Sequence, residues 1–142
     1  DIFAHFGTTG KVLEPCKGDG AIFDLLPPDA EWCEISEGRD FFDFAEPVDW
    51  IVTNPPYSKT RPFFNHAAAL ADDIVFLVPA RNVVSGYGFV RDARACGGTA
   101  EIRWYGTGSK LGFPMGNAIA AFHWKRGFIG PTKQSFYDER EI

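Results

Sequence analysis

The sequence predicts an α/β fold, in which one mostly parallel β-sheet has helices on both faces and ends in an antiparallel hairpin. Three observations lead to this prediction. Short apolar segments alternate with segments of helical pattern, which is typical of a parallel sheet. Residues 74–78 are apolar throughout, as in a central strand that is covered on both sides. The last two predicted strands have only a loop between them, so we expect them to pair antiparallel.

The elements follow one another along the chain in a regular order. The first strand is a short apolar run that ends in Glu14, and the third is the apolar run that precedes Asn54. The segment between Glu34 and Asp40 is too short for the usual intervening helix, which predicts a reduced version of the fold. We predict strands over residues 11–14, 31–35, 49–53, 74–78, 100–104 and 118–124, and helices over residues 21–26, 62–70 and 87–96.

Length and composition indicate a single domain over residues 1–142. The chain has 142 residues, of which 45% are hydrophobic and 23% are charged. A chain of this size buries roughly 68% of the surface that its unfolded form exposes, which is enough for one core. Residues 125–142 form a polar, charged tail, which we expect to be peripheral, wrapping the surface or partly disordered.

The chain lacks the features of membrane proteins and of disulfide-rich proteins. No apolar stretch approaches the roughly eighteen residues of a spanning helix, and the amino terminus has no signal-peptide pattern. The three cysteines are an odd number without metal-ligand spacing. We therefore expect a soluble, cytoplasmic protein with no membrane partner, no disulfide framework and no metal site.

The tetrapeptide Asn54-Pro55-Pro56-Tyr57 is the strongest indication of chemistry, because it follows a predicted strand. Pro56 fixes its own φ and favours an extended Pro55, so the Pro55 carbonyl and the Asn54 amide oxygen become two convergent acceptors. They can take both hydrogens of an exocyclic amine while Tyr57 stacks on the ring that bears it. The alternative is a proline-stiffened turn with Asn54 as its cap.

A glycine-containing segment about forty residues upstream, Glu14-Pro15-Cys16-Lys17-Gly18-Asp19-Gly20, predicts a ligand loop. Glycines at this spacing let the backbone approach a ligand closely at a strand-to-helix turn. The spacing is neither the dinucleotide fingerprint nor a phosphate-binding loop. Glu14 and Asp19 make the loop acidic, which suits a cationic ligand or an ammonium group. The alternative is an ordinary tight turn, and Cys16 is best interpreted as a small residue that fits.

Two further acids lie where a nucleoside cofactor would need them. Glu34 lies twenty residues after Glu14, where the glycine-rich segment begins, and at about this separation an acid commonly binds ribose hydroxyls. Asp40 precedes two phenylalanines and could bind an adenine amino group while a phenylalanine covers the ring. The alternative for each acid is a solvated loop carboxylate.

In these segments the chain resembles S-adenosylmethionine-dependent amino methyltransferases, especially the adenine-specific DNA methyltransferases. Residues 13–20 are similar to their cofactor loop, Glu34 to the ribose-binding acid, Asp40 to the adenine-binding acid and residues 54–57 to the catalytic motif. A hairpin aromatic stacks against the target base in that family, and Phe113 matches it best. The alternative for Phe113 is an apolar anchor in a flexible surface hairpin.

This resemblance implies a Rossmann-like class I methyltransferase sheet, S-adenosylmethionine as cofactor, and methyl transfer to the adenine amino group of DNA without a metal. It also implies a restriction-modification or phage setting. The residues implied in catalysis are Asn54, Pro55, Pro56 and Tyr57, and those implied in substrate binding are Tyr57 and Phe113. The residues implied in cofactor binding are Glu14, Pro15, Cys16, Gly18, Gly20, Glu34, Ile35, Asp40, Phe41 and Asn54.

Net charge and length indicate that DNA recognition needs another region or a partner. The net charge of -5 lacks the basic surface that phosphate binding normally demands, and no residues remain for a separate recognition domain. The chain is then a catalytic core of a longer protein, a subunit that borrows recognition from a protein partner, or an enzyme of low selectivity. Before the first strand, only residues 1–6 could cover the methionine end of the cofactor.

Two other functions stay open. The same tetrapeptide serves related families that methylate a glutamine amide in a protein or an amino group in RNA. The Glu14-Pro15 form of the loop favours DNA, because the glutamine-modifying relatives more often resemble an Asp-x-Gly-x-Gly form. The third function is that of a cofactor-binding subunit that is active only with a partner.

Overall fold

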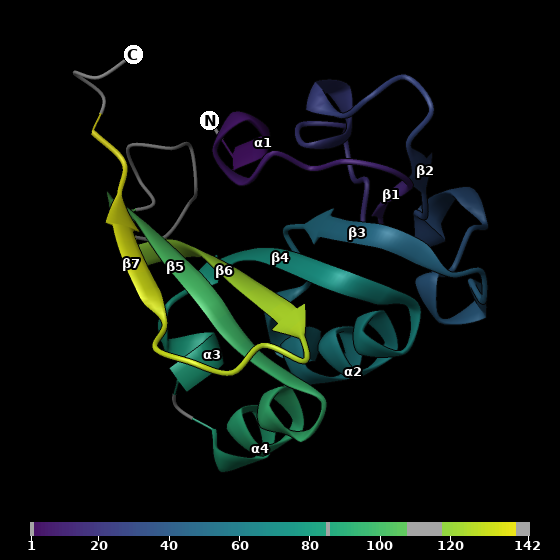
Figure 1. The fold of residues 1–142 in the computed structure, drawn as a ribbon. Helices are drawn as coiled ribbons and strands as arrows, with labels where there is room; N and C mark the ends of the chain where they lie inside the picture. Colours follow the sequence, from purple (N-terminus) through teal and green to yellow (C-terminus); the bar gives the residue numbers. More distant parts are fainter. Residues whose placement is uncertain (1, 85, 108–117, 139–142) are drawn as a thin grey trace.

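The structure, a computed structural model, describes residues 2–84, 86–107 and 118–138 (Figure 1). Its strands are β1 (Val12–Glu14), β2 (Glu31–Trp32), β3 (Val48–Thr53), β4 (Ala71–Pro79), β5 (Gly97–Thr107), β6 (Ala118–Arg126) and β7 (Lys133–Phe136). Its α-helices are α1 (Ile2–Phe6), α2 (Thr60–Leu70), α3 (Arg81–Val84) and α4 (Tyr87–Ala95). Short 3-10 helices are η1 (Phe23–Leu25), η2 (Ile35–Glu37), η3 (Phe41–Asp43) and η4 (Tyr57–Lys59). The longest helix in this described part, α2, has 11 residues, and none is long and apolar enough to cross a membrane.

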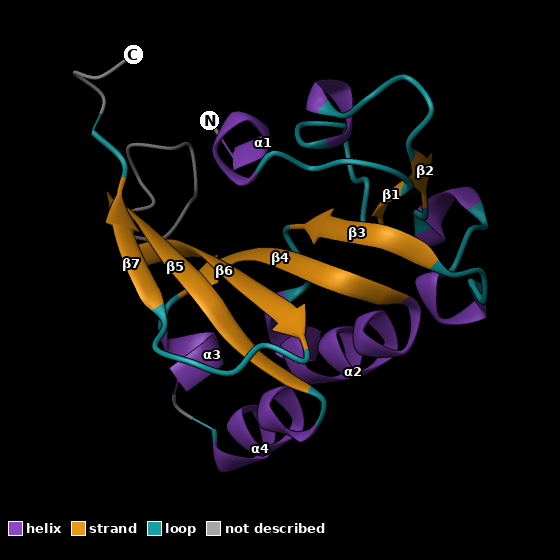
Figure 2. Cartoon of the chain, in the orientation of Figure 1, coloured by secondary structure: helices purple, strands orange, loops and turns teal. Residues whose placement is uncertain are grey.

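The strands form one sheet in the order β2-β1-β3-β4-β6-β5-β7 (Figure 2). β2, β1, β3 and β4 are parallel, β6 runs antiparallel to both β4 and β5, and β7 is parallel to β5. This arrangement confirms the predicted mostly parallel sheet and its antiparallel hairpin. The register aligns Leu13 with Ile51 and Thr53 with Phe76, so the carboxyl ends of β1, β3 and β4 lie at one edge.

Apolar side chains bury both faces of the sheet, and helices cover the two faces unequally. On one face α2 and α4 pack over a large core that includes Ile51, Ile74 and Trp124. Trp124, which is fully buried, donates a hydrogen bond from Nε1 to the Ala93 carbonyl at 2.6 Å. The other face has a smaller core, around Val52 and partners from α1 and the region of η1. Helices therefore lie on both faces, as predicted, but one face is thinly covered.

The main differences from the predicted elements each have a structural reason. The segment 21–26 forms only the 3-10 helix η1, because Leu26 precedes a proline and is held extended at φ -80° and ψ 162°. The strand predicted over residues 31–35 stops at Trp32, because the Glu34 side chain caps η2 by accepting a hydrogen bond from Ser36 N. Within the predicted tail, Lys133–Phe136 form the strand β7, which pairs with β5.

Helix α1 was not predicted, and it has only five residues. Two contacts hold it on the thinly covered face. The Nε2 of His5 lies 2.6 Å from Oε1 of Glu101 on β5, and the Phe6 ring packs edge-on against His123 of β6. These contacts place the amino-terminal residues of α1 near the carboxyl edge of the sheet.

Candidate active site

The loops after β1 and β3 meet at one edge of the sheet, because these strands are adjacent and parallel. The glycine loop follows Glu14, and the tetrapeptide follows Thr53. A cavity of about 580 Å³ opens at this edge, and Cys16, Gly18 and Asn54 all line it. The structure thus brings the two predicted motifs together at the strand ends where α/β proteins commonly bind ligands.

The backbone of the glycine loop turns sharply at its two glycines. Gly18 has a φ of +56° and Gly20 a φ of +96°, which residues with a Cβ rarely adopt. At Gly20 a Cβ would also meet a carboxylate oxygen of Asp24 at 3.1 Å. Cys16 lies between β1 and these two glycines. Burial raises the pKa of its thiol to about 11, so this side chain stays neutral near pH 7.

Glu34 fixes the glycine loop against the segment that follows β2. Its Oε2 accepts a hydrogen bond from Gly18 N at 2.8 Å. Its Oε1 accepts hydrogen bonds from Ser36 N at 3.0 Å and from Ser36 Oγ at 2.9 Å. The backbone hydrogen bonds from Ser36 and Gly18 lower the pKa of Glu34, so the carboxylate is charged at neutral pH. Glu34 shapes the loop but does not itself line the cavity.

On the sequence expectation that this loop binds S-adenosylmethionine, replacing Glu34 with alanine is expected to weaken that binding about tenfold, because hydrogen bonds to a charged group are worth roughly 1.5–3 kcal/mol. The loss of the bond to Gly18 N would release the loop from its bound shape. Calorimetric titration gives the dissociation constant directly. Glu46→Ala is the matched control, since Glu46 is exposed and makes only a 3.8 Å ion pair with Lys11. Equal constants for parent and Glu34→Ala would contradict the role of Glu34.

Glu14, at the end of β1, is fully buried. Its Oε1 accepts a hydrogen bond from Cys16 N at 3.1 Å, and its Oε2 has no hydrogen-bond partner in the described part of the chain. Burial raises the pKa of Glu14 to about 8, and the nearby Thr53 hydroxyl and Cys16 amide offset only part of that rise. Glu14 is therefore mainly a neutral acid near pH 7. The loop is less acidic than the sequence predicts, and Asp19 is the acid that lines the cavity.

The tetrapeptide leaves β3 as a rigid turn into η4. Pro56 has a φ of -56° and precedes Tyr57, the first residue of η4. The Tyr57 side chain is half-buried against the core under α2, and burial raises the pKa of its phenol. In the described residues neither the Asn54 Oδ1 nor the Tyr57 Oη has a hydrogen-bond partner of normal geometry, although both atoms are buried.

Four buried polar side-chain atoms lack a partner in the described residues, and they lie on consecutive parts of this one edge. They are Glu14 Oε2, Thr53 Oγ1, Asn54 Oδ1 and Tyr57 Oη. A buried polar atom without a partner costs roughly 1–3 kcal/mol, so folded proteins rarely keep several together without use. The cluster marks the ends of β1 and β3 as the place where a ligand with hydrogen-bonding groups would find partners.

The other predicted residues lie at varying distances from this cavity. Pro15 is buried behind the loop, and Ile35 is 70% exposed on η2. The Asp40 side chain caps η3 by accepting from Phe42 N at 2.9 Å. Phe41 is only 2% exposed and packs against Phe63 and His66, so its ring belongs to the core and has no free face for a nucleobase. Phe113 lies outside the described residues.

Ile2 and Phe3 of α1 line the cavity, and they belong to residues 1–6, which the sequence offered as a cover for the cofactor. Three further lining residues were not predicted: Leu77 of β4, Tyr105 of β5 and Tyr137. Tyr137 reaches it because its backbone N–H donates to the Trp104 carbonyl at 2.9 Å, which extends the pairing of β7. Tyr105 directly follows the strand predicted over residues 100–104, a position that could have identified it. The polar tail gave no comparable signal for Tyr137.

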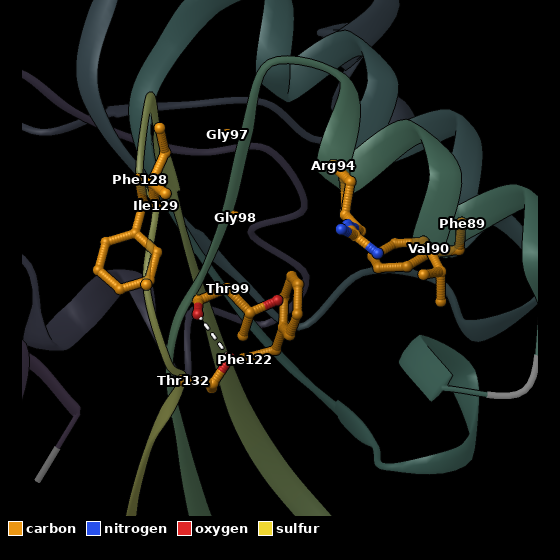
Figure 3. Close-up of a pocket in the computed structure, with 12 residues that line it drawn as sticks. Phe89, Val90, Arg94, Gly97, Gly98, Thr99, Phe122, Phe128, Ile129 and Thr132 are labelled. Atoms are coloured by element: carbon orange, nitrogen blue, oxygen red, sulfur yellow. Dashed lines mark hydrogen bonds between the residues drawn. The ribbon is translucent and has the colours of Figure 1, made fainter.

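A second cavity, of about 430 Å³, lies between α4 and the first residues of β5 (Figure 3). Phe89 and Phe122 line it together with Arg94, and the Thr132 hydroxyl donates to the Thr99 carbonyl at 2.8 Å across one side. None of the four unpartnered buried atoms belongs to its lining. The candidate chemistry is therefore at the strand ends that carry the glycine loop and the tetrapeptide.

Neither a protein-family model nor a curated protein matches the chain. Solved structures do match its fold. A chain from Vibrio vulnificus YJ016, described as a modification subunit of a type I restriction enzyme, superposes with a TM-score of 0.66 at 15% identity, over 97% of this chain and 46% of that one. A chain from Pyrococcus horikoshii, described as an RNA methyltransferase, superposes with a TM-score of 0.65 at 12% identity, over 88% of this chain and 79% of that one.

A chain from Listeria monocytogenes, described as a class I S-adenosylmethionine-dependent methyltransferase, gives a TM-score of 0.59 at 12% identity, over 89% of this chain and 58% of that one. The sheet order and these likenesses together show that the chain has the class I methyltransferase fold. It spans 58% of the length of the Listeria chain and 46% of the Vibrio chain.

Proposed function

We propose that this chain binds S-adenosylmethionine in the 580 Å³ cavity and transfers a methyl group to the exocyclic amino group of adenine in DNA. One observation is the main support for this proposal. Asn54 Oδ1 is a buried acceptor without a partner in the described part of the chain, on a residue that lines the same cavity as the glycine loop. An amine hydrogen is the kind of donor that this oxygen lacks.

The residues around the cavity fit the cofactor. Its volume lies within the roughly 300–1,000 Å³ of small-molecule sites, and its lining combines apolar side chains with a few polar groups. In the proposal Cys16 and Gly18 contact the cofactor, Asn54 lies beside its methyl group, and Ile2 and Phe3 cover it from α1. When bound, S-adenosylmethionine supplies a methyl group that is activated by a positively charged sulfur.

The loops beyond β2 would hold the nucleoside part of the cofactor. In the proposal Glu34 helps to bind the ribose in two ways. It fixes the glycine loop, and its own carboxylate is an acceptor. Ile35 offers an exposed apolar surface, and Asp40 an acceptor at the start of η3. Glu14, Pro15 and Gly20 set the shape of the loop from within. Phe41 supports this region from the core and does not cover the ring.

The tetrapeptide would act on the acceptor amine by position and by charge. The Asn54 oxygen and the Pro55 carbonyl accept the two amine hydrogens, which favours a tetrahedral nitrogen with a directed lone pair. Tyr57 stacks on the base, a contact worth roughly 1–3 kcal/mol, which offsets part of the few kcal/mol needed to flip a base from duplex DNA. Pro56 keeps the two acceptors in place, because its ring restricts the backbone.

Tight and selective binding of DNA requires a partner or a further region. The net charge is -5, so phosphate binding must come largely from elsewhere. The similar Vibrio chain is described as a modification subunit, and this chain matches 46% of it. We therefore propose that the chain works as the catalytic part of a larger assembly in a restriction-modification or phage setting.

The acceptor is tested by incubating the protein with methyl-labelled cofactor and separate pools of duplex DNA, single-stranded DNA, RNA and denatured protein. Label in DNA, recovered as N6-methyladenine after digestion, is the expected result. Label in RNA alone or in glutamine amides alone would replace the proposed acceptor with one of the two alternatives. Cofactor binding without label in any pool would contradict transfer by this chain on its own.

A further inference from the structure

The Tyr57 carbonyl is held by side chains from two different segments. Thr60 Oγ1 donates to it at 3.0 Å, and Asn82 Nδ2 donates to it at 3.2 Å. The Asn82 amide also lies 3.4 Å from Thr60 Oγ1, so the three groups form one small network. The bond from Thr60 is local, as expected for a threonine near a helix start, whereas Asn82 is 25 residues away in sequence. The long-range bond requires an explanation of its own.

The fold brings Asn82 to this carbonyl through the order of the strands. Tyr57 belongs to η4, which follows β3, and Asn82 belongs to α3, which follows β4. β3 and β4 are neighbouring parallel strands, so the segments after them lie side by side at the carboxyl edge. Asn82 therefore ties the tetrapeptide to the next segment of the sheet edge.

One side of Tyr57 borders open space, so packing does not fix the residue there. Tyr57, Thr60 and Asn82 all line a cavity of about 340 Å³ that lies outside the 580 Å³ cavity. Open space beside a side chain leaves its position to hydrogen bonds, because contacts with neighbouring atoms are absent there. Thr60 is only 5% exposed, so its hydroxyl donates to the Tyr57 carbonyl with little competition from water.

We propose that Asn82, together with Thr60, is a positioning residue for the tetrapeptide. By holding the Tyr57 carbonyl, the two side chains set the direction of the Tyr57 ring, and through the short Pro55-Pro56 link they set the direction of the Asn54 oxygen. Neither side chain touches the reacting atoms. The consequence for turnover rests on the proposed methyl transfer, but the consequence for the Tyr57 ring does not.

The kinetic test uses Asn82→Ala with Asn65→Ala as its matched control. Asn65 lies on α2, and its amide donates to Asp92 of α4 and not to the tetrapeptide. At saturating cofactor, Asn82→Ala is expected to lower the transfer rate about tenfold, because losing one hydrogen bond and the geometry it fixes is worth about 1.4 kcal/mol. The dissociation constant for S-adenosylmethionine and the Tm should match those of the control. Parental turnover in Asn82→Ala would overturn the proposal, as would a parallel fall in Tm and cofactor affinity.

A second pair of variants keeps the test decisive if Asn82→Ala does not fold. Thr60→Val removes the hydroxyl at nearly constant volume, and Thr60→Ser keeps it. Loss of turnover in Thr60→Val with recovery in Thr60→Ser supports the proposal. Equal turnover in both variants overturns it.

A readout without activity separates this proposal from the proposed function. Burial raises the pKa of the Tyr57 phenol, so a ring that gains access to water should titrate at lower pH. Ultraviolet titration of the parent minus Tyr57→Phe isolates the Tyr57 signal. In Asn82→Ala that signal is expected to move to lower pH, and in Asn65→Ala to stay. An unmoved signal in Asn82→Ala overturns the positioning role, even if no methyl acceptor is found.

Discussion

Asn54→Ala is expected to lower methyl transfer by about 10²-fold or more while leaving cofactor affinity within about twofold, the pattern that follows when a group acts chiefly on the transition state. Its Oδ1 is buried and has no hydrogen-bond partner of normal geometry in the described part of the chain, so its removal should cost the folded protein little stability. The measurements are the single-turnover rate with labelled cofactor and the dissociation constant by calorimetry.

The control for this prediction is again Asn65→Ala, which removes an exposed amide from α2, the helix that follows the tetrapeptide and η4. It should turn over like the parent. Parental activity in Asn54→Ala would refute the role of the tetrapeptide. Loss of cofactor binding together with activity would show that Asn54 serves the cofactor and not the amine.

The second large effect concerns the pH dependence of stability, and it arises from Glu14. The pKa of Glu14 is about 8 in the folded protein, compared with an ordinary value of 4.5. Between these values the folded state keeps a proton that the unfolded state has released, so the free energy of unfolding falls as the pH rises. Each pH unit inside the window costs the parent up to about 1.4 kcal/mol.

Glu14→Gln is expected to remove this component, because the amide has a similar shape and no charge to bury. The variant and the parent should be about equally stable near pH 4.5, and the variant should become more stable by a few kcal/mol near pH 8. Urea unfolding at several pH values measures the difference. Glu46→Gln is the control, because Glu46 belongs to an exposed ion pair. The difference in the free energy of unfolding between this variant and the parent should stay nearly constant across this pH range. Parallel curves for the parent and Glu14→Gln would contradict the assignment of a buried, neutral Glu14.

The strands could be predicted where the apolar pattern is strong. β3 contains the apolar run 50–52 and β4 the apolar run 74–79, and both strands lie in the centre of the sheet. The pattern fails where one side chain or a proline decides the backbone. Glu34 ends β2 early by capping η2, and the prolines after Leu26 prevent a full helix. β7 was missed because its residues are polar and it is held by pairing with β5, which no local pattern indicates.

The site could be predicted in part for the same reason. Cys16, Gly18 and Asn54 belong to motifs at strand ends, so parallel pairing of β1 and β3 is enough to bring them together. The walls of the cavity depend on tertiary contacts that only the folded chain defines, as with Tyr105 and Tyr137. Residue type alone also did not separate core from site: Phe41 occupies a predicted binding position and is buried in the core.

The account depends on one cavity that takes the cofactor beside the Asn54 oxygen. A crystal structure of the protein with S-adenosylhomocysteine, the demethylated product, tests this most directly. The account predicts that the ligand occupies the cavity lined by Gly18 and Asn54, with its sulfur toward Asn54. A ligand bound elsewhere, such as between α4 and β5, or no binding at millimolar concentration, would contradict it.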